Sequence, residues 1–392
     1  MPIEAAQLGG AQSAQAGFMK KIRTLMQEGR FADARNELAA ISEKYPDAAA
    51  VHLLLGHTHF REDHHDQALS EYERALGINP RLVFAPLMMG LVYQAQEEGD
   101  SALDQFENAL EIDPDFIPAH LQMGRTFMNM NKPEEAEDSV QKVLDINPQH
   151  LASRLMLANL RAKHNREEAV EILKNVIRDN PNVVIAHQML GLLQLRMNNA
   201  TAAKSTFKQA LKISPERMLN HFFLGETYFK LKDYPAAEQE FREVIKRFEK
   251  ARAAKYRLAD TLMEMDRHPE AITILQRIIW ESPKRNAAHQ RLAEIYTRQG
   301  RADFAIQEYR AAVKHDPRIV EAYPDIEALL ENPEDAKKVA AEITAQMKKV
   351  TLVSKRPENP EAVKRARRNM MRSAIQRRQA AKAAENATGA DA

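Results

Sequence analysis

Residues 68–80 of the chain read ALSEYERALGINP, and residues 102–114, 34 positions later, read ALDQFENALEIDP. Both stretches begin with alanine, carry an aromatic residue four positions on and end with proline. The same proline recurs at spacings of 34 residues, apart from one spacing of 33 and one of 68, at Pro46, Pro80, Pro114, Pro148, Pro181, Pro215, Pro283 and Pro317. A fixed period of this length indicates a tandem array of one structural unit.

Two further positions of the unit hold small residues. Twelve residues before the unit's end, all nine units have alanine, at Ala34, Ala68, Ala102, Ala136, Ala169, Ala203, Ala237, Ala271 and Ala305. Twenty-four residues before the end, or 23 in the shorter fifth unit, stand Gly56, Gly90, Gly124, Gly191 and Gly225, with Ala158, Ala259 and Ala293 as substitutes. Small residues let two helices cross closely, an aromatic ring fills the groove beside them, and proline ends the second helix. The unit is therefore predicted to be two packed helices.

This pattern resembles the tetratricopeptide repeat, a helix–turn–helix unit of 34 residues. The resemblance implies an all-α fold, a right-handed superhelical solenoid of about nine units over residues 15–317. We expect a flexible N-terminal segment at 1–14, C-terminal capping helices at 318–350 and a basic amphipathic tail at 351–392. Repeat arrays need such caps because the last unit would otherwise leave its apolar face open.

Two units depart from the pattern. The fifth is one residue short, which we place in the turn from Lys163 to Arg166. The seventh has Glu249 where other units have proline, so we expect the junction from Phe248 to Ala254 to continue as a longer helix.

Composition excludes several classes of function. The chain has no cysteine, which removes disulfides, thiolate metal sites and cysteine nucleophiles. It also lacks a glycine-rich phosphate loop, a His-Glu-x-x-His helix and a serine elbow, so we expect no enzyme activity and no cofactor. The N-terminal residues do not read as a secretory signal, and no stretch reaches the roughly 18 apolar residues of a membrane span. We therefore expect a cytoplasmic protein.

The histidines and the single tryptophan are interpreted as structural. His57 and His59 diverge on a helix while His64 and His65 fall in a turn, so we expect no metal site there. Five other histidines recur at one place in their units, which indicates a role in the repeat: His52, His120, His187, His221 and His289. Trp280 lies near a helix end and is predicted to pack.

The resemblance places a partner-binding groove on the first helix of each unit. The first predicted stripe contains Met19, Leu53, Leu87, Leu121, Leu155, Phe222 and Tyr256, and the second contains Phe60, Met128, Leu195, Phe229 and Met263. A third row runs between them and contains Arg23, His57, Leu91, Arg125, Asn159, Leu192, Glu226, Asp260 and Glu294.

The chemistry of these rows predicts the kind of partner. Both stripes are mainly apolar, so we expect an apolar or amphipathic segment of a partner protein, or a second copy of the chain, to bind there. The third row is basic early in the array and acidic in its last three units, which would orient a charged ligand. Methionine and leucine at helical spacing are more often part of a buried core than of a binding site, and this alternative stays open.

The tail differs from the array in charge. Residues 355–382 hold ten basic and two acidic side chains, a net charge of +8. The basic helix proposed there includes Lys364, Arg365, Arg367, Arg368, Arg372, Arg377 and Arg378. It could contact nucleic acid, anionic membrane or an acidic protein face, including Glu226, Asp260, Glu264 and Glu294 of the same chain. The alternative function is thus an assembly or regulatory factor that uses this tail, and a merely solvated tail is the third possibility.

Overall fold

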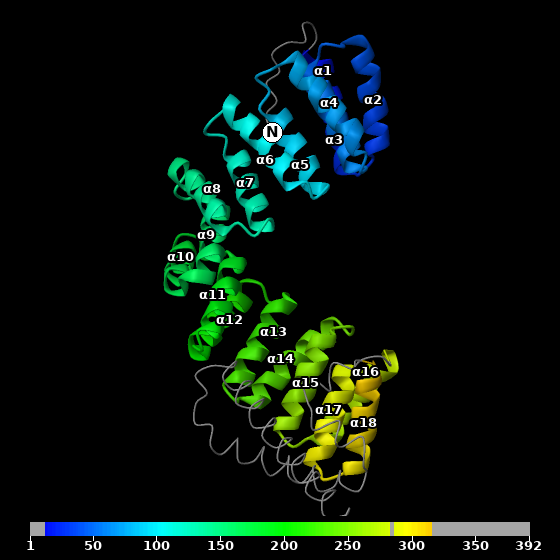
Figure 1. Cartoon of the computed structure of the whole chain (residues 1–392), viewed down its shortest axis with the longest axis vertical. Helices are drawn as coiled ribbons and strands as arrows, with labels where there is room; N and C mark the ends of the chain where they lie inside the picture. Colours follow the sequence, from blue (N-terminus) through cyan, green and yellow to red (C-terminus); the bar gives the residue numbers. More distant parts are fainter. Residues whose placement is uncertain (1–11, 283–285, 316–392) are drawn as a thin grey trace, which may run out of the picture. The chain divides into compact units, whose positions relative to one another are not determined.

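The computed structural model describes residues 12–282 and 286–315, and these residues form α-helices joined by short turns, without a β-strand (Figure 1). The eighteen helices in this part of the chain are α1 (Gln12–Gln27), α2 (Phe31–Lys44), α3 (Ala49–Arg61), α4 (His65–Ile78), α5 (Phe84–Ala95), α6 (Gly99–Ile112), α7 (Ile117–Asn129), α8 (Pro133–Ile146), α9 (Leu151–His164), α10 (Arg166–Asp179), α11 (Val184–Arg196), α12 (Ala200–Ile213), α13 (Met218–Lys230), α14 (Tyr234–Arg247), α15 (Arg252–Glu264), α16 (His268–Glu281), α17 (Asn286–Arg298) and α18 (Ala302–His315).

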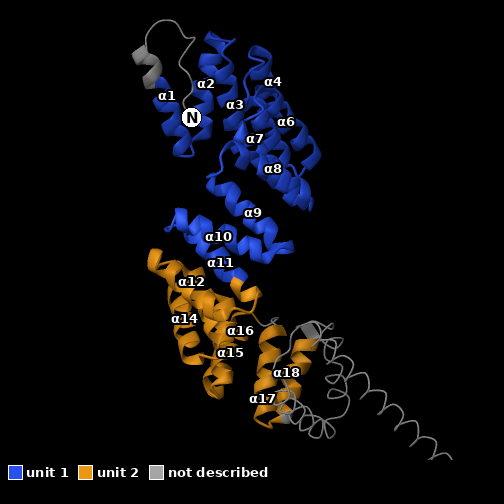
Figure 2. Cartoon of the chain, turned by 90° about the vertical axis from the view of Figure 1, so that its left-hand side faces the viewer, with its two compact units in different colours: residues 1–193 blue, residues 194–392 orange. Residues whose placement is uncertain are grey.

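The helices alternate as first and second helices of nine repeats, which confirms the predicted all-α repeat fold. In the pairs α3–α4, α5–α6 and α13–α14, the two helices pack along each other. The chain forms two compact units, residues 1–193 and residues 194–392, with the boundary inside α11 (Figure 2). The predicted capping helices at 318–350 and the basic tail at 351–392 lie outside the described residues, as does most of the segment 1–14.

Four hairpins pack a glycine of the first helix, Gly56, Gly90, Gly124 or Gly225, against a large residue of the second. Tyr72, Phe106, Phe207 and Phe241 are all fully buried. A Cβ atom added to Gly90 would lie 2.4 Å from a ring carbon of Phe106, so only glycine allows this approach. The predicted small–aromatic pairing therefore fixes the crossing of the two helices.

The turn inside most hairpins contains one residue in the left-handed region, at the same place in the unit: Gly29, Asp63, Glu97, Asn131, Asn198, Lys232, Asp266 and Gly300. The fifth hairpin has no such residue within the described chain. Asn165 alone joins α9 to α10 there, and its side chain accepts a hydrogen bond from the backbone of Glu168 at 3.1 Å. The predicted deletion between Lys163 and Arg166 is confirmed.

The junction at Glu249 does not form the longer helix that the missing proline predicted. Helix α14 ends at Arg247, and Phe248 is extended with a φ of −139°. The carbonyl of Phe248 accepts a hydrogen bond from Ala251 at 2.9 Å, as the carbonyl of Asn79 does from Leu82 at 3.0 Å in an earlier unit. The extended residue and this turn end the helix without help from proline, so the prediction was wrong.

The recurring histidines fasten one repeat to the next. In His52 the Nε2 atom donates to the carbonyl of Pro46 at 3.0 Å, because a carbonyl can only accept, and Nδ1 lies 2.6 Å from the carboxylate of Glu71. The same bond to the proline six residues earlier is made by His120, His187 and His221. These contacts agree with a structural role within the repeat.

Trp280 is 83% exposed, so the prediction that it packs was wrong. In α16 the inward positions belong to Leu275 and Ile278, which are fully buried. Because Trp280 lies only two residues after Ile278, its side chain leaves the helix on a different face.

Candidate partner-binding surface

The first helices of successive repeats lie next to each other within each compact unit. Helix α3 contacts α5 and α5 contacts α7 in the first unit, while α13 contacts α15 and α15 contacts α17 in the second. First helices therefore share one face of each unit. That face is where the sequence predicts the groove.

In the first unit the predicted groove residues divide by burial. Leu53 and Leu87 are only 8% and 7% exposed, because each packs against the second helix of its own hairpin. Arg125 and Asn159 are exposed, and the half-buried positions are Met19, Phe60, Leu91, Leu121, Met128, Leu155 and Leu192. In the second unit Met263 is also core, at 3% exposed. The expectation of an accessible side chain thus fails at Leu53, Leu87 and Met263.

The second unit contains an open cavity of about 450 Å³ on this face. It brings together three predicted groove residues and four that the sequence analysis missed: Leu195, Glu226 and Phe229, with Lys230, Lys232, Tyr234 and Arg257. Phe222 and Tyr256, also predicted, are half-buried on the same first helices.

Aromatic and cationic side chains are held together at this cavity. The Arg257 guanidinium lies 4.3 Å from the centroid of the Phe229 ring, and the Tyr234 ring meets the Phe229 ring edge-on at 5.5 Å. The Lys230 ammonium donates to the carbonyl of Leu195 at 2.8 Å and to Asn198 at 2.9 Å. The cavity therefore offers an apolar wall bordered by two lysines and by the ion pair of Arg257 with Glu226.

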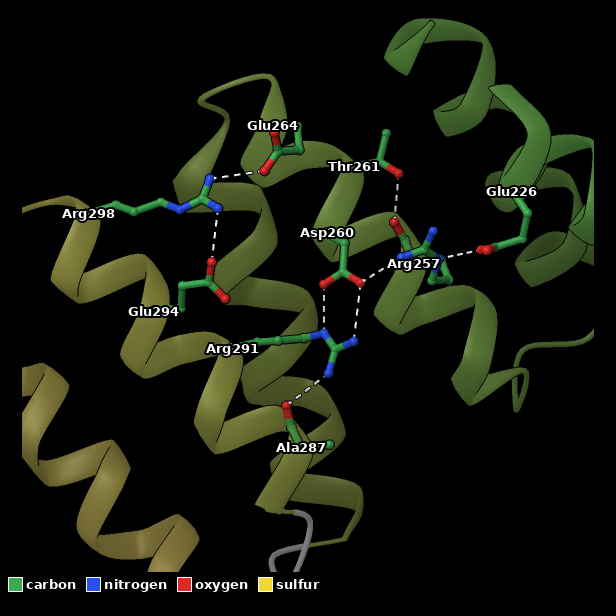
Figure 3. A network of polar contacts seen from close by, with 9 residues as sticks. All are labelled: Glu226, Arg257, Asp260, Thr261, Glu264, Ala287, Arg291, Glu294 and Arg298. Atoms are coloured by element: carbon green, nitrogen blue, oxygen red, sulfur yellow. Dashed lines mark hydrogen bonds and ion pairs between the residues drawn. The ribbon is translucent and has the colours of Figure 1, made fainter. Parts of the chain in front are cut away.

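A ladder of ion pairs crosses the first helices beside the cavity (Figure 3). Arg257 bonds to Glu226 of α13 and, at 3.2 Å, to Asp260 of its own helix. Arg291 of α17 donates to both carboxylate oxygens of Asp260, at 2.6 and 3.1 Å. Burial by itself lowers the pKa of Arg291, but the hydrogen bond and charge of Asp260 outweigh it, so this pKa lies above its ordinary value.

The last acidic residues of the row are paired in the same way. Arg298 donates to Glu264 at 3.1 Å and to Glu294 at 2.9 Å. All four carboxylates that the sequence analysis took as a free acidic end are thus ion-paired by arginines. The negative charge available to a basic ligand, or to the basic tail, is correspondingly small.

These arginines had a signal in the sequence that was not used. Arg257 and Arg291 are 34 residues apart, and each stands three residues before an acidic member of the row, Asp260 or Glu294. A periodic arginine next to a periodic acid predicts pairing between neighbouring repeats.

Metal binding and membrane insertion find no support in the part of the chain that the structure describes. No group of three or more histidine and carboxylate side chains there is arranged to hold a metal ion. Among the same residues, no helix combines the length and the apolar character of a membrane span. His59 and His64 have ring centroids 6.0 Å apart.

Solved structures of repeat proteins resemble this one in fold. One is a tetratricopeptide repeat protein from Parabacteroides merdae, with 20% identity and a TM-score of 0.47, covering 63% of this chain and 98% of its own. YrrB, described as having an unusual peptide-binding site, has 21% identity and a TM-score of 0.38, covering 47% and 95%. PilF of Pseudomonas aeruginosa has 19% identity and a TM-score of 0.46, covering 54% and 97%.

No curated protein matches the chain in sequence. Two models of the tetratricopeptide repeat do match it, one over residues 19–82, 189–253 and 256–324 and the other over residues 93–160 and 228–279. One of these models alone spans half of the chain, and the helix pairs described above follow the same period. The chain belongs to the tetratricopeptide repeat family.

Proposed function

We propose that this protein is a non-enzymatic scaffold or adaptor that binds a segment of a partner protein on the first-helix face of its second unit. The observation that carries the proposal is the cavity where Leu195 and Phe229 lie beside Lys230, Lys232 and Arg257. Cavities with mainly apolar walls and a few fixed polar groups are typical binding sites.

The chemistry of the cavity favours an amphipathic segment. An apolar or aromatic side chain of the partner would pack beside Phe229 and Tyr234, which already contact each other. Lys232 is exposed and has no ion pair with a described residue, so it is available to an acidic group of the partner. Glu226 is already paired with Arg257. We therefore expect the affinity for the partner to depend more on apolar contacts than on new ion pairs.

The test places a photoreactive amino acid at single positions of the full chain. One variant carries it at Phe229 in the cavity, and the matched control carries it at Gln239, an exposed residue of α14 on a second helix. Irradiation in cell extract should give a discrete crosslinked protein from position 229 and not from position 239. The crosslinked protein is then identified and purified.

Affinity of the purified partner completes the test. Phe229→Ala should weaken binding about tenfold or more, which corresponds to about 1.4 kcal/mol, and Gln239→Ala should leave it unchanged. Circular dichroism checks that both variants remain folded. Equal crosslinking at the two positions, or full affinity of folded Phe229→Ala, would refute the proposed site. Leu87 is not a suitable target because its replacement would disturb the core.

A further inference from the structure

The two compact units carry opposite net charge. The described residues of the first unit, 12–193, contain 18 basic and 27 acidic side chains, a net charge of −9. Those of the second unit, 194–282 and 286–315, contain 21 basic and 15 acidic side chains, a net charge of +6. The near-neutral total of the chain conceals this division.

In the first unit the negative charge gathers on the outward side of two second helices. We call this the acidic outer face, and it consists of Asp100, Asp104, Glu107 and Glu111 of α6 with Glu134, Asp138 and Asp145 of α8. The four α6 residues follow the spacing of one helical face, and all seven residues are exposed. None of them has an ion pair with another described residue.

In the second unit two positions near the end of each of two second helices carry basic residues. We call this the basic outer face, and it consists of Lys208 and Lys212 of α12 with Arg242 and Lys246 of α14. Helix α12 contains three lysines and no acidic residue. Arg242 pairs with Glu238 at 2.7 Å and with Glu270 at 3.4 Å, and Lys246 lies 3.8 Å from Glu243. The unpaired positive charge of this face therefore belongs to Lys208 and Lys212, which have no ion pair among the described residues.

The two outer faces share three places of the repeat, where Glu107, Glu111 and Asp145 of the first unit correspond to Lys208, Lys212 and Lys246 of the second. Each face is built from two neighbouring second helices of 14 residues, with the charged side chains on the same side. Two surfaces of opposite charge are electrostatically complementary to each other.

We propose that the acidic outer face of one copy of this chain binds the basic outer face of a second copy. The contact is heterologous, since each copy contributes a different surface and keeps its other face free. Association can then continue from copy to copy. The first-helix cavity takes no part in this contact, so a bound partner segment and self-association are compatible.

The size of the faces sets the strength of the contact. A 14-residue helix is about 21 Å long and about 10 Å across, so two helices offer roughly 420 Å² per copy. Stable complexes bury about 800 Å² per partner. The association is therefore weak, and it depends on salt because charges exposed to solvent are screened within about 10 Å at 0.1 M salt and about 3 Å at 1 M.

The test is sedimentation velocity of the full chain with two charge-reversed variants. One is Glu107→Lys with Glu111→Lys, and the other is Lys208→Glu with Lys212→Glu. All four positions are exposed, so both variants should fold, as circular dichroism will show. The unmodified chain should associate at about 0.01 M salt and dissociate at about 1 M. Each variant alone should associate on the order of tenfold more weakly, because the charge of the acidic outer face falls from −7 to −3 in the first variant and that of the basic outer face falls from +4 to 0 in the second.

Mixing the two variants in equal amounts should restore association, since the unaltered acidic outer face of one variant then meets the unaltered basic outer face of the other. A single species of monomer mass for the unmodified chain at low salt would overturn the proposal. So would variants that associate like the unmodified chain, or a mixture that stays dissociated. A full-chain variant with Arg365, Arg367, Arg368 and Arg372 changed to glutamine should associate normally. If only that variant lost association, the acidic outer face would bind the basic tail instead of the basic outer face.

Discussion

Arg291 and Asp260 form a two-bond ion pair between neighbouring repeats, with Nε 2.6 Å from Oδ1 and Nη2 3.1 Å from Oδ2. The two residues are 31 positions apart in sequence and lie on α17 and α15. The same guanidinium lies 4.8 Å from the centroid of the Tyr256 ring. One arginine thus joins two first helices by charge and by ring contact.

Replacing Arg291 with glutamine should lower the free energy of unfolding by about 1–2 kcal/mol, since Asp260 loses two charge-assisted bonds in a partly buried setting. Arg252→Gln is the control, because Arg252 is exposed on α15 and has no ion pair with a described residue. It should change stability by less than about 0.5 kcal/mol. Urea denaturation of Arg291→Gln, of Asp260→Asn and of the double variant gives the coupling energy, and a value of zero would contradict the pairing.

Gly90→Ala should destabilise the protein by about 1–3 kcal/mol, because the new methyl group would overlap the buried Phe106 ring. The control is Gly77→Ala on α4, where nothing lies within 4 Å of the added carbon. That change should stabilise the helix by about 0.5–1 kcal/mol. Thermal unfolding of the two variants should therefore shift in opposite directions, and equal shifts would contradict the close helix crossing.

Tyr72→Phe should raise stability by about 1 kcal/mol. The Tyr72 hydroxyl is buried without a hydrogen-bond partner, and burial raises the pKa of this phenol. Removing it ends the cost of an unsatisfied polar group while the ring still fills the groove beside Gly56. Phe106 and Phe207 occupy the same place in other units. A loss of stability measured by urea denaturation would show that the hydroxyl has a partner.

The fluorescence of Trp280 should show that its indole ring is in contact with solvent. Its fluorescence in the folded chain should resemble that of indole in water and be quenched freely by iodide, because 83% of the residue is exposed. Trp280→Ala should change the free energy of unfolding by less than about 0.5 kcal/mol. A shielded tryptophan at low protein concentration would mean that another part of the chain covers α16.

Acidification should lower the free energy of unfolding, because the unfolded chain protonates His57 more readily than the folded chain does. Burial lowers the pKa of the His57 ring, and the nearby charge of Arg61 lowers it further. The unfolded chain then takes up this proton near its ordinary value of about 6.5, whereas the folded chain takes it up at lower pH. Stability linked to His57 is therefore complete above about pH 6.5 and is lost as the pH falls toward the lowered value.

The measurement compares the unmodified chain with His57→Gln in urea at about pH 7.5 and about pH 5. The variant should lose less stability between the two conditions, because glutamine has no proton to take up. Equal losses of stability in the two proteins would mean that His57 has the same pKa in the folded and the unfolded chain.

The fold could be predicted from residues that act within a single repeat. Gly90 and Phe106 belong to one hairpin, and the missing turn residue before Asn165 also lies inside one hairpin. The helix end at Phe248 was harder to predict, because no proline follows it and the helix ends there at a residue with an extended backbone. Burial was harder still: Leu53 and Leu121 stand at equivalent positions of the predicted stripe, yet Leu53 is buried and Leu121 is half-buried.

The sequence by itself determined the repeat period, the helix pairs and the small–aromatic contacts, since each of these depends on residues close together in the chain. Only the tertiary structure decided which leucines remain accessible and that Glu226, Asp260, Glu264 and Glu294 are neutralised by arginines. Exposure and net local charge depend on side chains that meet across neighbouring helices, 31 residues apart in the case of Asp260 and Arg291. A one-dimensional pattern contains the residues of such a contact but not their distance.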